Sequence, residues 1–111
     1  MKTSELVGPA LDWAVASANG YIKDCNTWLY EATLEEINEG SYHPSTDWAQ
    51  GGTIIEREEI EIRKANAKEW HGWMKTIGTG GHGQTPLIAA MRCYVESKLG
   101  SDVHIPKEIT T

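Results

Sequence analysis

The alternation of apolar and polar residues predicts a first helix near the start of the chain. Its apolar positions recur at i, i+3, i+4 and i+7, which places them on one helical face: they are Leu11, Ala14, Val15 and Ala18. Gly8-Pro9 precedes this stripe with proline at a first-turn position, and Asn19-Gly20 follows it with residues that suit a helix C-cap. Trp13 lies off the stripe, and we expect it to pack against a neighbouring strand.

A second, broader apolar stripe predicts the central packed helix. Its members are Leu87, Ile88, Met91, Val95 and Leu99. Thr85-Pro86 opens this segment, with a threonine suited to the N-cap and a proline suited to the first helical position. Gly100 ends it.

Strands are expected between and after these helices. Residues 21–32 are rich in β-branched and aromatic residues and predict one or two short strands, followed by a helical turn over residues 33–40. Alternation at residues 60–63 and again at residues 70–74 predicts a hairpin. Residues 103–105 suggest a last edge strand, which Pro106 would stop.

Two glycine-containing segments are expected to be loops. Residues 41–52 predict an ordered loop with one short helical turn, followed by a brief helix over residues 53–58. Residues 76–83 contain four glycines and are expected to connect the hairpin to the second helix. Together these elements predict one α+β domain over residues 1–111, in which two main helices pack on a small, mostly antiparallel sheet.

Charge narrows the function classes. Ten Lys and Arg against sixteen Asp and Glu give a formal net charge of −6. Binding to nucleic acid polymers depends mostly on neutralised phosphates, so this balance argues against a DNA- or RNA-binding protein. The chain shows no secretory leader and no run of about 18 apolar residues, so a membrane span is not expected. We therefore expect a cytoplasmic protein whose Cys25 and Cys93 are reduced.

Metal and cofactor binding are not expected. The four histidines are isolated from one another in the sequence, and the two cysteines form no C-x-x-C pair. No G-x-S-x-G motif is present either. A third hypothesis is an enzyme that uses Asp47 and Glu56 as paired carboxylates, but acidic residues are too numerous for one such pair to be informative.

The segment from Gly78 to Thr85 nearly matches the phosphate-loop pattern G-x-x-x-x-G-K-[ST], with Gln84 in place of the lysine. Glycine N–H groups and the following helix N-terminus suit an anion. Without the lysine, we expect binding of a phosphate but no NTP hydrolysis. The alternative is a flexible connection that ends in a Thr-Pro cap.

A second cluster lies in residues 42–50, which gather aromatic rings, hydroxyls, a carboxylate and an amide. Such a mixture suits a site that stacks a planar ligand and fixes it with a few polar contacts. In the alternative interpretation, Ser45 or Thr46 caps a short helix and Trp48 fills the core.

Three blocks of sequence carry a family resemblance. They are residues 2–16, residues 44–57 with Pro-Ser-Thr-Asp-Trp-Ala-Gln-Gly-Gly, and residues 85–100 with Thr-Pro-Leu-Ile-Ala-Ala-Met-Arg-Cys-Tyr-Val. In this order they resemble the NinX-like family of small lambdoid bacteriophage proteins, a domain of unknown function. The resemblance implies a phage accessory protein acting in the host cytoplasm, and it supplies no catalytic residues. Residues 24–40 and 66–80 depart most from the family pattern.

Two functional hypotheses follow. The first is a non-catalytic binder of a small phosphorylated or nucleotide-like ligand, which in a phage would sequester a host antiviral signal. Its expected ligand-binding residues are Tyr42, Ser45, Thr46, Asp47, Trp48, Gln50, Arg57, Gly81, His82, Gly83, Thr85 and Arg92. A homo-oligomer would let such sites form across interfaces. The second is a protein–protein interaction module that modulates a host or phage protein through residues 42–50, which we call the aromatic loop.

Overall fold

The computed structural model describes residues 1–20, 27–75 and 77–109. In chain order its elements are the 3-10 turn η1 (Thr3–Glu5), the helices α1 (Gly8–Ala18), α2 (Thr27–Glu39) and α3 (Trp48–Glu58), the strands β1 (Glu61–Lys64), β2 (Trp70–Met74) and β3 (Thr79–Gly83), and the helix α4 (Pro86–Leu99). The strands form one antiparallel sheet in the order β1-β2-β3. The predicted α+β class is confirmed.

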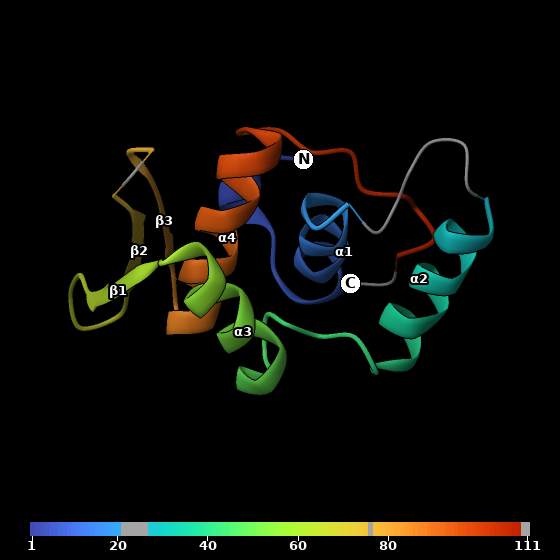
Figure 1. Ribbon diagram of the computed structural model, residues 1–111, viewed down its shortest axis with the longest axis horizontal. Helices are drawn as coiled ribbons and strands as arrows, with labels where there is room; N and C mark the ends of the chain where they lie inside the picture. The colour runs from blue at the N-terminus through green and yellow to red at the C-terminus, as the bar shows by residue number, and fades with distance from the viewer. Residues whose placement is uncertain (21–26, 76, 110–111) are drawn as a thin grey trace.

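Helix α4 lies at the centre of the fold. Figure 1 shows the sheet, α4, α1 and α2 following one another along the long axis of the molecule, with α3 beside α4. That axis measures 40 Å. Both sides of α4 are covered, and the buried residues of the helix are Leu87, Ala89, Ala90, Met91, Cys93, Tyr94 and Val95. The broad apolar stripe therefore marked the central packed helix correctly, except at Leu99, which is exposed.

The ends of the two main helices follow the predicted caps. The Thr85 side chain accepts a hydrogen bond from the Ile88 backbone nitrogen at 3.1 Å, and Pro86 occupies the first turn of α4. Gly100, at φ 85°, ends that helix. In α1, Pro9 occupies the first turn and Asn19 is the C-cap.

Helix α2 replaces predicted strands. Residues 27–32 belong to this helix, so the strand prediction is wrong there, whereas residues 21–26 lie outside the described part. Tyr30, Leu34 and Ile37 recur at helical spacing and pack in a cluster with Trp13 of α1. The Trp13 and Tyr30 rings meet edge to face with centroids 5.1 Å apart. Trp13 thus packs on a helix, because burial of this stripe overrides the strand preference of single residues. The turn predicted for residues 33–40 is the end of α2.

Helix α3 begins inside the predicted loop. The Asp47 side chain accepts a hydrogen bond from the Ala49 backbone nitrogen at 2.9 Å, which caps the helix at Trp48. The helix predicted over residues 53–58 is thus confirmed but begins at Trp48, inside the segment predicted as a loop with one short helical turn. The prediction that Ser45 or Thr46 is the cap is wrong. Gly51 is helical, and a side chain at this position would collide with the Pro44 carbonyl and the Leu87 side chain. The glycine permits close packing of α3 and has no role in a turn.

Strand β3 replaces the predicted glycine loop. The hairpin of β1 and β2 is confirmed, with Glu61 opposite Trp73 and Lys64 opposite Trp70. Residues 79–83, predicted as loop, pair with β2 along its whole length. Near the C-terminus, by contrast, the predicted strand at residues 103–105 does not form, since a single bridge joins Lys2 and Asp102.

Candidate functional site

The two faces of the sheet have different surroundings. On β2, Gly72 and Met74 are buried and turn toward the α4 side. Side chains alternate along a strand, so His71 and Trp73 lie on the opposite face. The strand register adds the residues opposite them, which are Glu61 and Arg63 from β1 and His82 from β3. We call this surface, together with Lys75 at the end of β2, the open face.

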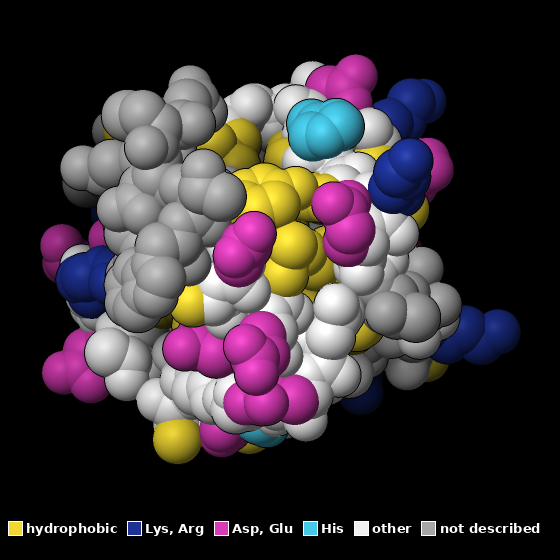
Figure 2. Space-filling view, turned by 90° about the vertical axis from the view of Figure 1, so that its right-hand side faces the viewer, with side chains coloured by type: hydrophobic (Ala, Val, Ile, Leu, Met, Phe, Trp, Pro, Cys, Tyr) yellow, Lys and Arg dark blue, Asp and Glu magenta, His cyan; other side chains and the backbone are white. Residues whose placement is uncertain are grey.

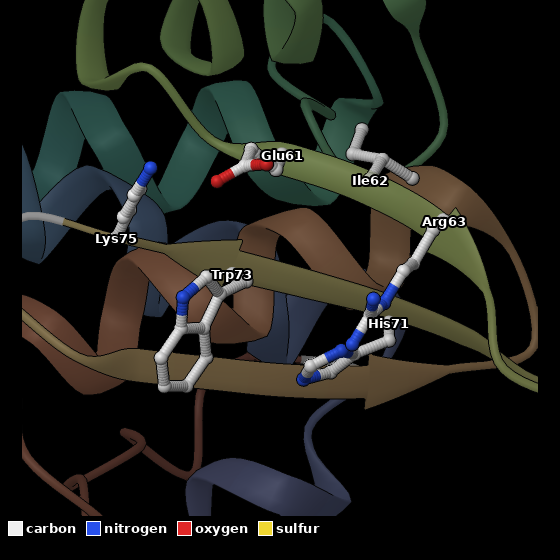
Figure 3. Close-up of a pocket in the computed structure, with 6 residues that line it drawn as sticks. All are labelled: Glu61, Ile62, Arg63, His71, Trp73 and Lys75. Carbon is white, nitrogen blue, oxygen red and sulfur yellow. The ribbon is translucent and has the colours of Figure 1, made fainter.

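Three rings form a row on the open face. The His71 and His82 rings are stacked, with centroids 4.5 Å apart and planes at 20°. The His71 and Trp73 rings follow at 6.0 Å and 39°. An alanine Cβ at position 80 would lie 2.9 Å from His71 Nε2 and 2.9 Å from Trp73 Cε3. Gly80 therefore lets both rings lean across β3, and Figure 3 shows the Trp73 indole over this strand.

Two cations flank the rings. Arg63 extends from β1 toward His71, and Lys75 lies at the other end of the row beyond Trp73 (Figure 3). With Glu61, Ile62 and the rings of His71 and Trp73, they line a shallow pocket of 560 Å³. Within the described ranges, neither cation forms an ion pair. The open face thus offers aromatic rings and positive charge to a ligand.

The surroundings of His71 favour the neutral form of its imidazole. Partial burial lowers its pKa from the ordinary value of 6.5, and the neighbouring His82 and Arg63 lower it further. A neutral imidazole can stack on a flat ring without adding repulsion toward Arg63. Since the folded protein resists protonation of His71 more than the unfolded chain does, the unfolded chain binds more protons in this window.

The free energy of unfolding should therefore fall as the pH is lowered through about 6.5, and the loss should be complete below the lowered pKa of His71. The check is the thermal midpoint between pH 8 and pH 5 for the wild type and for His71→Gln. The difference in thermal midpoint between the wild type and His71→Gln should become smaller, or change sign, toward acid pH. A His104→Gln variant, which removes an exposed histidine elsewhere, is the control for the substitution itself. Parallel pH profiles for the wild type and His71→Gln would contradict the assignment.

Several residues expected to bind a ligand instead hold the loop before α3. Gln50 accepts a hydrogen bond from the His43 backbone nitrogen at 2.7 Å and donates one to the Ser41 carbonyl at 2.9 Å. The Tyr42 hydroxyl accepts a hydrogen bond from Asn19 at 3.2 Å. Ser45 is buried, and Asp47 caps α3. The contacts of Gln50, Tyr42 and Asp47 explain these three residue types by folding alone.

The aromatic loop and the start of α4 do meet. Ser45, Thr46 and Trp48 line a groove of 220 Å³ together with residues 85–88. Trp48 is 56% exposed, so the interpretation that it fills the core is wrong. The groove wall contains Pro86, Leu87 and Ile88 and is chiefly apolar. It is a second candidate surface, with a character that suits an apolar partner better than a phosphate.

The predicted residues Gly81, His82 and Arg92 meet at a pocket of 450 Å³, separate from the pocket on the open face. Gly81 and Gly83 sit in β3 against the α4 backbone, where Cβ atoms would lie 2.6 Å from Cys93 N and 2.8 Å from Ala89 N. Arg92 donates to the Leu6 carbonyl at 2.9 Å and to the His82 carbonyl at 2.8 Å.

Arg57 is also engaged by its own chain. It donates to Asn19 Oδ1 at 2.9 Å and to the Tyr94 hydroxyl at 3.0 Å. Of the residues predicted to bind a ligand, only His82 lies on the open face. Because Gly81 and Gly83 are in a strand, the predicted phosphate loop does not form.

Sequence reasoning missed Arg63, His71, Trp73 and Lys75. A signal was present, because His71 and Trp73 alternate with Gly72 and Met74 at strand spacing. Strand alternation does not reveal which face of the sheet a helix covers. The covered face is decided by the small residues of α4, which let this helix pack closely on the sheet.

Within residues 1–20, 27–75 and 77–109, no helix is long and apolar enough to cross a membrane. The same ranges contain no group of three His, Cys, Asp or Glu side chains arranged to hold a metal ion. Cys93 is buried, and burial raises the pKa of its thiol to about 11, so this thiol is poorly reactive at neutral pH.

The fold and the open face define a small α+β protein with an aromatic, partly cationic sheet surface. A family described as "Bacteriophage P22, NinX" matches residues 2–98. The chain belongs to this family of phage proteins, as the three sequence blocks indicated. A comparison with curated proteins finds no match.

Proposed function

We propose that this protein is a non-catalytic binder of a small, phosphorylated, nucleotide-like ligand, which it sequesters in the cytoplasm of the phage host. The observation that carries the proposal is the row of Trp73, His71 and His82 rings flanked by Arg63 and Lys75. Stacking of a base on an aromatic side chain contributes about 1–3 kcal/mol, and the cations attract phosphate oxygens. Sequestration needs binding without turnover, which stacking and charge supply.

The charged residues that line the pocket are two cations, Arg63 and Lys75, and one acid, Glu61, although the whole chain has a net charge of −6. Figure 2 shows the α2 end of the molecule, where acidic side chains gather around partly exposed hydrophobic atoms. Exposed acids of this helix are Glu31, Glu35, Glu36 and Glu39. They lie at the opposite end of the long axis from the sheet (Figure 1). Ionic screening is strong over distances beyond about 10 Å, so these acids have little influence on a ligand at the open face.

Thermal unfolding against nucleotides tests the proposal. The panel contains cyclic di- and trinucleotides, mononucleotides and ADP-ribose derivatives, each at about 1 mM. A ligand at 100 times its dissociation constant adds about 2.7 kcal/mol to the free energy of unfolding. The midpoint of a domain this size should then rise by about 10 °C. A panel that leaves the midpoint unchanged would overturn the proposal.

Variants locate the site. Trp73→Ala should weaken binding of the active nucleotide at least tenfold, since it removes a stacking surface. Lys75→Gln, which removes a cation of the same pocket outside β1, should weaken it to a similar degree. Trp48→Ala is the matched control, because it removes an exposed tryptophan from a different surface. Unchanged affinity in Trp73→Ala would exclude the open face, whatever ligand binds.

A second candidate function is protein–protein interaction through the groove beside Trp48. The supporting observation is the exposed indole next to Pro86, Leu87 and Ile88, since tryptophan is enriched at the centres of interfaces. In this case Trp48→Ala would abolish capture of the partner and Trp73→Ala would not.

A further inference from the structure

Strand β1 leaves one edge of the sheet unpaired. It is the outer strand in the order β1-β2-β3, and its Glu61, Arg63 and Lys64 are exposed. In the part of the chain that the structure describes, no backbone hydrogen bond from another element reaches residues 61–64 on this edge, and the nearest one joins the Ile60 nitrogen, just before the strand, to the Ile55 carbonyl of α3 at 3.0 Å. The strand contains no proline that would block pairing. Free N–H and C=O groups on such an edge can pair with another strand.

The direction of the backbone groups on β1 can be read from the hairpin. The Ala65 nitrogen donates to the Glu69 carbonyl at 3.0 Å, so the backbone of Ala65 turns toward β2. Backbone groups alternate between the two sides of an antiparallel strand. Glu61 and Arg63 therefore also turn theirs toward β2, and Ile62 and Lys64 turn theirs outward. An added antiparallel strand would pair with these outward groups.

Charge selects one register for a second copy of β1. In a symmetric antiparallel pair, a two-fold axis at Ile62 places Glu61 opposite the partner's Arg63, and Arg63 opposite the partner's Glu61. Axes at Glu61 or Arg63 instead place two like charges directly opposite each other. Opposite charges across strands stabilise a pair and like charges destabilise it. The strand is thus complementary to itself in a single two-fold register.

We propose that β1 pairs with β1 of a second copy about a two-fold axis at Ile62. The two three-stranded sheets then form one continuous sheet, in which both open faces lie on the same side. Each Arg63 faces the partner's Glu61 across the two strands, while both Trp73 rings and both Lys75 side chains stay accessible. The pairing rests on the edge and its charges, and it holds whether or not a nucleotide binds.

Charge reversal tests the register. In sedimentation equilibrium at low salt, Glu61→Arg and Arg63→Glu should each raise the dimer dissociation constant at least tenfold. The double variant, which exchanges the two charges, should return it to within threefold of the wild type. Lys68→Glu, the matched control, makes the same change of charge as Arg63→Glu at the exposed turn of the same hairpin. A monomeric wild type up to 1 mM, or single variants that dimerise as the wild type does, would overturn the proposal.

Cross-linking provides an independent measurement. Residue 62 faces its own copy across the axis, with Cα atoms about 5.5 Å apart as expected for a hydrogen-bonded pair. This separation lies within disulfide range, so Ile62→Cys should form a covalent dimer under mild oxidation. The two copies of residue 64 are offset by four positions, or about 14 Å, and Lys64→Cys should not cross-link. Equal cross-linking of both variants would exclude this register. Nucleotide binding is read separately, by thermal shift, so either proposal can fail alone.

Discussion

Gly81→Ala is expected to lower the free energy of unfolding by about 3 kcal/mol or more. The added Cβ would lie 2.6 Å from Cys93 N and 2.8 Å from Ala89 O. Both are backbone atoms of α4, so they cannot yield as a flexible side chain would. Overpacking of a well-packed core typically costs about 1–3 kcal/mol, and a clash with helix backbone lies at the upper end or beyond. Urea denaturation measures the change.

Gly52→Ala is the control for this prediction. Gly52 lies in the interior of α3, and the nearest atom to a new Cβ is in the Trp48 side chain at 4.0 Å. Alanine in a helix interior is more favourable than glycine by about 0.5–1 kcal/mol, so this variant should be at least as stable as the wild type. A loss of less than 1 kcal/mol in Gly81→Ala would show that β3 and α4 are not in such close contact.

This result would also change how glycine variants are interpreted. As residues of a presumed phosphate loop, Gly81 and Gly83 would have been natural targets for abolishing ligand binding. Their Cβ positions fall on α4 atoms, so bulkier residues there would abolish any activity by unfolding the sheet. Exposed residues of the open face, such as Trp73 and Arg63, are the informative targets.

Asp12→Ala is expected to lower the free energy of unfolding by about 2 kcal/mol, or the midpoint by about 10 °C. Asp12 is 4% exposed, and its carboxylate accepts a hydrogen bond from the Ser45 backbone nitrogen at 2.9 Å. The bond ties the loop before α3 to α1. Alanine would leave a buried N–H without its acceptor, which costs about 1–3 kcal/mol. Thermal and urea unfolding at pH 7 measure the loss.

Asp12→Asn separates the hydrogen bond from the charge. The amide oxygen can still accept from Ser45, so this variant should lie within about 1 kcal/mol of the wild type at pH 7. Burial raises the pKa of Asp12 above its ordinary value of 3.8. The folded protein therefore binds more protons than the unfolded chain in the window above 3.8, and wild-type stability gains from this group as the pH falls through it. Relative to the wild type, Asp12→Asn should become less favourable toward acid pH. An Asn variant as unstable as the Ala variant would refute the hydrogen-bond role.

Local signals in the sequence were sufficient for part of the fold. Thr85-Pro86 and Gly100 predicted the start and the end of α4, because caps act within a few residues of the helix end. The hairpin was predictable for a similar reason, since strand alternation and a short turn are local. By contrast, α2 takes its helical form from packing of Tyr30 and Ile37 with Trp13, and those contacts are distant in sequence.

Strand β3 and the open face depend on tertiary contacts that no local rule encodes. Glycine is unfavourable in strands by intrinsic preference, so Gly80, Gly81 and Gly83 predicted a loop. In the structure, each glycine is required by a neighbour: Gly81 and Gly83 by the backbone of α4, and Gly80 by the His71 and Trp73 rings. His82 was predicted as a ligand-binding residue for its place among glycines, while its neighbours in the row belong to a different strand.

The sequential arrangement of sheet, α4, α1 and α2 has a consequence for how members of this family diverge. A residue of α4 is constrained from two sides, whereas α2 packs chiefly on α1 and the hairpin is free on its open side. Substitutions at either end can therefore accumulate without repacking the middle. Relatives are therefore expected to share the centre of the fold and to differ most at α2 and on the open side of the hairpin.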